Sequence, residues 1–177
     1  MRILLSALLC AAIAACSGQS SEGEAAASVP EVVTGEYRAA SDTARNLTGN
    51  LSLERGGLIF DKGVVLYTRA LMPRQAFERV ARDGDSYAAI LVSPGELAID
   101  LRRVTEQTLT GDAKSLCGEE RPAYVAIAHE DRATSLTVLV FAGEEPPGPE
   151  ATQSRLCGAF AYAAPDGART REGVVLR

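Results

Sequence analysis

Residues 47–69 read LTGNLSLERGGLIFDKGVVLYTR, and this stretch decides the fold. Two glycine-containing turns, Arg55-Gly56-Gly57 and Asp61-Lys62-Gly63, interrupt it. They leave three short segments, residues 47–54, 58–61 and 64–69. Apolar residues of one parity recur in the first segment, at Leu47, Leu51 and Leu53, as in a strand with one buried face. Short segments of this kind joined by tight glycine turns predict a β-meander.

The strand pattern continues toward the C-terminus. In residues 96–105, Ile99 and Leu101 alternate with Asp100 and Arg102, which indicates one buried and one wet face. Further strands are predicted at residues 87–92, 123–128, 134–142, 157–163 and 173–176. About eight short strands predict a mainly β or α+β domain, built as an antiparallel sheet or a small barrel.

One helix is predicted, at residues 73–82. Pro73 suits the first helical position, and Gly84 can end the helix. Phe77, Val80 and Ala81 would share one face of it, which we expect to be buried.

The N-terminus has a separate character. Arg2 precedes an apolar run, residues 3–15, which is shorter than the roughly 20 residues that cross a bilayer. An ordinary secretory signal ending at Ala12-Ile13-Ala14 is one interpretation. The tetrapeptide Ile13-Ala14-Ala15-Cys16, however, resembles the lipobox of bacterial lipoproteins. That resemblance implies cleavage before Cys16 and lipidation of its thiol and amine, but no biochemical activity.

This interpretation divides the chain into three parts. Residues 1–15 are the predicted signal peptide, and residues 16–31 are the lipidated cysteine and a flexible tether. The tether is rich in Gly, Ser, Glu and Ala and would reach roughly 20 Å. Residues 32–177 form a single β-rich domain. Ser17 is not the Asp associated with inner-membrane retention, so the lipoprotein resemblance implies an outer membrane location facing the periplasm.

Two cysteines remain after processing. Cys10 leaves with the signal peptide and Cys16 carries lipid, so Cys117 and Cys157 are left. In an exported protein they most simply form a disulfide. A redox pair is usually more closely spaced, and a zinc site needs four ligands. No cluster of His or Cys supplies the other two, so we predict no metal site.

The charge of the chain limits its partners. The signal peptide holds one of the 18 Lys and Arg residues, which leaves 17 against 23 Asp and Glu, a balance of −6. Nucleic acid binding needs clustered cations, so the acidic domain is not predicted to bind it.

Few residues suggest chemistry. The single histidine, His129, precedes Glu130 and Asp131 in a predicted solvated hairpin turn. Arg102 and Arg103 point to opposite faces of a strand, where one could meet an anion. Gly84-Asp85-Ser86 resembles the start of a GDS-type hydrolase block, but a turn explains it. We therefore predict no catalytic residue and no cofactor.

The leading hypothesis is a non-enzymatic envelope lipoprotein that binds an envelope protein, a glycan or another ligand. One alternative is a periplasmic hydrolase that uses carboxylates brought together by folding. The other is a carrier of hydrophobic ligands. Gly35-Glu36-Tyr37 resembles the G-x-W opening of lipocalins, whose barrels hold a ligand in an open apolar interior.

Overall fold

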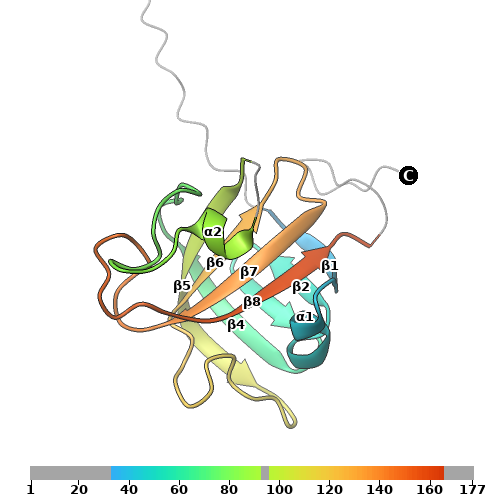
Figure 1. The fold of residues 1–177 in the computed structure, drawn as a ribbon. Helices are drawn as coiled ribbons and strands as arrows, with labels where there is room; N and C mark the ends of the chain where they lie inside the picture. The colour runs from blue at the N-terminus through green and yellow to red at the C-terminus, as the bar shows by residue number, and fades with distance from the viewer. Residues whose placement is uncertain (1–32, 93–95, 166–177) are drawn as a thin grey trace, which may run out of the picture. The chain divides into compact units, whose positions relative to one another are not determined.

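The computed structural model describes residues 33–92 and 96–165. These residues form an antiparallel barrel in which each strand pairs with the next and β1 pairs with β8 (Figure 1). The strands are β1 (Gly35–Ala39), β2 (Leu51–Glu54), β3 (Gly57–Phe60), β4 (Val64–Ala70), β5 (Ala98–Leu109), β6 (Tyr124–His129), β7 (Ser135–Ala142) and β8 (Arg155–Ala163). Two short helices accompany them, α1 (Asp42–Leu47) and α2 (Tyr87–Leu91). The mainly β, antiparallel prediction is confirmed.

The predicted meander is present as β2, β3 and β4. Leu53 pairs with Leu58, which pairs in turn with Leu66, and all three are buried. Gly63 has φ +88°, and a Cβ there would lie 2.6 Å from the Thr110 carbonyl oxygen. The turn therefore requires glycine. The prediction was wrong at Leu47, which ends α1 instead of opening a strand.

The predicted helix at residues 73–82 is wrong, and so is the strand predicted at 87–92. Backbone groups of the first segment bond elsewhere: Arg74 N donates to Ile99 O and Val80 N to Asp85 O. The helix begins instead at Tyr87, because the Ser86 hydroxyl accepts a bond from Ala89 N and caps it. Phe77 is exposed, whereas Val80, predicted on the same helix face, is buried.

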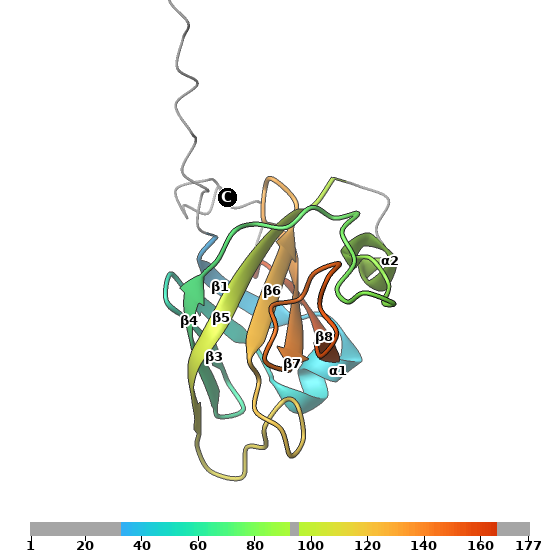
Figure 2. The same cartoon turned by 90° about the vertical axis from the view of Figure 1, so that its left-hand side faces the viewer.

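The barrel wall carries apolar clusters on both sides. The interior is filled by nearly fully buried apolar side chains, the largest of which are Tyr37, Tyr162, Phe60 and Phe160. On the outside, Tyr87 of α2 and Val80 cover Ile99, Leu101 and Phe141. Figure 2 shows the α2 segment outside the wall. This cover explains why all six residues of β6 are buried.

The disulfide between Cys117 and Cys157 is confirmed, with their Cα atoms 4.9 Å apart. It ties the connection from β5 to β6 onto β8. Ala113 and Leu116 of that connection pack against the interior cluster. One end of the barrel is therefore closed by a covalently held loop.

Several predictions lie outside the described residues: the signal peptide, Cys16, the tether and the strand at 173–176. Among the residues that the structure does describe, neither helix is long and apolar enough to cross a membrane.

Candidate functional site

Strand β5 is much longer than its neighbour β6. β6 pairs with β5 only from Ala98 to Arg103, whereas β4 pairs with it as far as Leu109. The last backbone bond on the β6 side joins Val104 N to Ala123 O at 2.8 Å. Beyond it, no strand in the described part of the chain pairs with β5 on that side.

The unpaired backbone groups can be assigned to residues. Thr110 N donates to Gly63 O, on the side of β4. Because backbone groups alternate along a strand, those of Thr108 also face β4, while those of Gln107 and Leu109 face away from it. β5 therefore ends in an open edge that can accept another strand.

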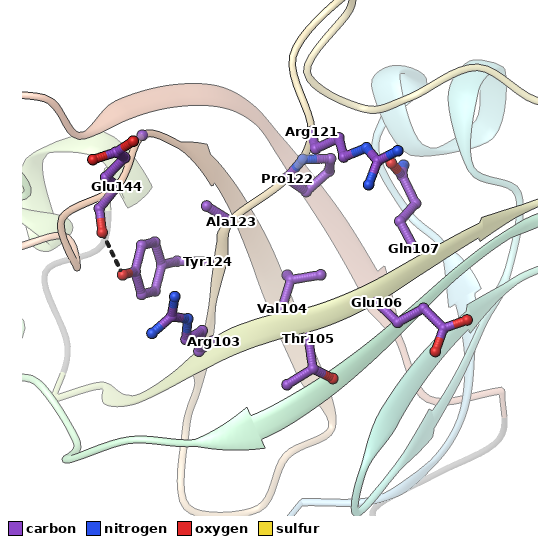
Figure 3. Close-up of a pocket in the computed structure, with 11 residues that line it drawn as sticks. Arg103, Val104, Thr105, Glu106, Gln107, Arg121, Pro122, Ala123, Tyr124 and Glu144 are labelled. Carbon is purple, nitrogen blue, oxygen red and sulfur yellow. Dashed lines mark hydrogen bonds between the residues drawn. The ribbon is translucent and has the colours of Figure 1, made fainter.

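A groove of about 520 Å³ follows this edge (Figure 3). Val104, Ala123 and Pro122 line its middle. Arg103 lies at one end, and Arg121 lies at the other beside Gln107. The first end is closed by Tyr124, whose hydroxyl donates to the Glu144 carbonyl at 2.8 Å. The groove thus has a short apolar centre between two guanidinium groups.

The charged side chains of the groove are not paired with one another. Arg103, Arg121, Glu106 and Glu144 form no ion pair within the described residues. The side-chain nitrogen of Gln107 is buried and has no hydrogen-bond partner there either. The charged groups are available to a ligand that carries charges of both signs.

A second polar group of residues lies inside the barrel. Arg102 is only 2% exposed, and its Nη1 donates to the carbonyl oxygens of Glu54 at 3.2 Å and Arg55 at 3.4 Å. Burial lowers the pKa of its guanidinium, and the charge of Asp100 partly offsets this. Arg102 and Arg103 do face opposite sides, as predicted, but the buried one binds the protein's own turn.

His129 belongs to β6 and is buried, so its predicted place in a solvated turn is wrong. Its Nδ1 lies 3.0 Å from the Glu130 carbonyl and donates to it, which leaves Nε2 3.8 Å from an Asp100 carboxylate oxygen. Burial by itself lowers the pKa of His129. Asp100, the Glu130 carbonyl and the charge of Asp131 together raise the pKa above its ordinary value.

Sequence reasoning missed the groove. The strand pattern predicted an end at residue 105, and the free half of β5 lies beyond it. Ser86, the weak hydrolase match, serves as the cap of α2. Within the described residues, no group of three His, Cys, Asp or Glu side chains is placed to hold a metal.

Comparison with known proteins gives no significant match to a family model, a curated protein or a solved structure. The function must therefore be argued from the geometry of this chain.

Proposed function

We propose that this protein is a lipid-anchored envelope protein whose barrel binds an extended segment of another protein at the open edge of β5. The observation that carries the proposal is the unpaired half of β5, bordered by a groove. Strand addition at such an edge takes its affinity from main-chain hydrogen bonds and its specificity from neighbouring side-chain pockets.

The composition of the groove favours a polypeptide over the other ligand classes. Gln107 and Leu109 offer backbone donors and acceptors to an added strand. Arg103 and Arg121, together with Glu106 and Glu144, offer both charge signs in one groove. A purely anionic ligand would meet two carboxylates as well as the two guanidinium groups, whereas a peptide can carry matching charges of both signs.

The two alternative functions fit this geometry less well. A carrier needs an empty apolar interior, but large side chains such as Phe60, Phe160 and Tyr162 fill this barrel. A carboxylate hydrolase needs two acids that converge on one bond. Glu106 and Glu144 lie at opposite ends of the groove (Figure 3).

The proposed anchor is the lipid on Cys16, which rests on the lipobox resemblance. An anchored domain meets its partners within the thin layer that the tether allows. Tethering raises the effective concentration there, so a modest strand-edge affinity suffices.

The proposal is tested by photo-crosslinking in intact cells of the producing bacterium. A benzoylphenylalanine is placed at Glu106 or at Thr108, and at Ile59 on β3 as the control. Strand addition predicts one protein adduct from both β5 positions and none from Ile59. The two attachment points should lie two residues apart in the partner, because a paired strand advances in step with β5.

Two variants separate edge pairing from other contacts. Leu109→Pro removes an N–H that faces away from β4, so the barrel should keep its melting temperature while the adduct disappears. Leu109→Ala keeps that N–H and should keep the adduct. Adducts that persist in Leu109→Pro, or no adduct from either β5 position, would refute strand addition.

A further inference from the structure

Three apolar side chains are far more exposed than the fold requires. Met72 is 81% exposed, Phe77 78% and Val92 87%. They are the most exposed large apolar side chains of the described residues, and all three lie on the connection from β4 to β5. Single exposed apolar residues are common, but these three belong to one connection, which also covers the outer face of the barrel wall.

Val92 adds an independent observation. It ends α2 in the left-handed region, with φ 50° and ψ 41°. A β-branched residue is disfavoured there, and glycine or asparagine would fit without strain. The barrel gains nothing from an apolar side chain that is strained and exposed at once, which points to a role outside the domain.

The backbone around Phe77 is bonded to the start of the helix that Val92 ends. Ala76 O accepts from Ala88 N at 2.8 Å, and Glu78 O accepts from Tyr87 N at 3.1 Å, so the Phe77 turn is held against the first turn of α2. Val92 follows Ala88 by four residues, or about 6 Å along the helix. Both side chains are thus on the same small outer module.

The segment also lies near the end of the barrel at which β1 begins. Val92 borders a pocket with Glu130 and Ser135, at the turn between β6 and β7. The Tyr37 hydroxyl donates to Ala133 O in that same turn, which places the start of β1 at this end. The start of β1 and the module that carries Val92 therefore lie at the same end of the barrel.

We propose that Met72, Phe77 and Val92 contact the surface of the bilayer that holds the Cys16 lipid. This proposal rests on the anchor of the proposed function. The tether, with a reach of roughly 20 Å, keeps this end of the barrel near the headgroups. Apolar side chains beside exposed charged residues, here Arg79 and Arg82 with Asp83 and Asp85, can lie at the boundary between headgroups and acyl chains. Docking would orient the domain on the membrane.

The chain has no tryptophan, so one introduced residue reports on its own position. The lipidated full-length protein is reconstituted into phosphatidylethanolamine–phosphatidylglycerol vesicles, with or without brominated acyl chains. Phe77→Trp is compared with Leu47→Trp. Leu47 is also exposed, but it lies on α1, which both Figure 1 and Figure 2 show well away from α2.

Docking predicts that the Phe77→Trp variant shows a blue shift and loses most of its emission in brominated vesicles, while the emission of Leu47→Trp is unchanged. Adding Met72→Ser and Val92→Ser to Phe77→Trp should reduce the quenching. If the protein floats with the vesicles but the two single variants are quenched equally, docking is refuted and the anchor stands. If neither variant floats, the anchor itself is refuted, and the docking with it.

Discussion

At the scale of single residues, the largest fully buried side chain of the described residues is a charged one. Arg102 lies inside a mainly apolar barrel and donates to the carbonyl groups of the β2–β3 turn. It also interacts with the charge of Asp100, which faces His129 as well. One cation thus satisfies a turn and balances a carboxylate, and its removal leaves both without that partner.

Arg102→Met should lower the free energy of unfolding by about 2 kcal/mol, because two carbonyl oxygens and a partly buried carboxylate lose their cation. Arg103→Met is the matched control. Its side chain is exposed on the same strand, so the change should stay within about 0.5 kcal/mol. Urea unfolding followed by circular dichroism measures both. Equal effects of the two substitutions would show that Arg102 contributes no more than a surface arginine.

His129 should make stability depend on pH. Protonation of Nε2 turns a contact between a lone pair and the Asp100 carboxylate into an ion pair, so the folded state holds the proton more tightly than the unfolded state. The stabilisation is fully present below about pH 6.5, the ordinary histidine pKa, and is lost as pH rises through the higher folded pKa.

NMR can follow this group directly, because the chain has one histidine. We expect the pKa of His129 to lie above the ordinary histidine value in the unmodified protein. In the Asp100→Asn variant, the pKa of His129 should be lower than in the unmodified protein. Lys114→Asn, a charge change in the connection from β5 to β6, should leave the pKa unchanged. A pKa at or below the ordinary histidine value of about 6.5 in the unmodified protein would contradict the assigned geometry.

At the scale of elements, the disulfide holds the connection between β5 and β6 to β8 across a separation of 40 residues. Replacing both Cys117 and Cys157 by Ser should lower the free energy of unfolding by about 4 kcal/mol, since the loop gains freedom in the unfolded chain. Reductant should destabilise the unmodified protein to the same level and leave the double variant unaffected. No difference between oxidised and reduced protein would contradict this role.

The sequence predicted the strands far better than the helix, for identifiable reasons. The apolar patterns of β2, β4 and the first half of β5 are local, and glycine turns mark the ends of β2, β3 and β4. The segment around Pro73 and Phe77 has helical spacing, but tertiary bonds to β5 and α2 replaced its helical ladder. The predicted number of about eight strands agrees with the structure. The agreement hides two errors, because the strand predicted at 87–92 is α2 and no bounds were predicted for β1.

The candidate site could not be predicted, because it depends on how far each of the two neighbouring strands pairs with β5. No local sequence pattern indicates that β6 stops pairing with β5 at Arg103 while β4 continues to pair with it as far as Leu109. The burial of Arg102 and His129 likewise follows from barrel closure, which turns one strand face inward. The disulfide is the exception. It could be predicted from the sequence, because only two cysteines remain after the predicted processing.

At the scale of the whole molecule, we propose an anchored, filled barrel that acts through its outside. The anchor is tested by Cys16→Ser, which should abolish acyl labelling and release the protein from the membrane fraction. Cys10→Ser is the control and should change neither, because that residue leaves with the signal peptide. A Cys16→Ser protein that keeps its label and stays in the membrane would refute lipidation at this residue.

The central claim is that a partner strand completes the open edge of β5. The most direct measurement is amide hydrogen exchange with a synthetic peptide of the segment found by crosslinking. We predict that the amides of Gln107 and Leu109 exchange quickly in the free protein and slowly with the peptide. The Thr108 amide, which faces β4, should be slow in both. If the peptide binds and leaves Gln107 and Leu109 unchanged, the partner does not pair with β5 and the claim is wrong.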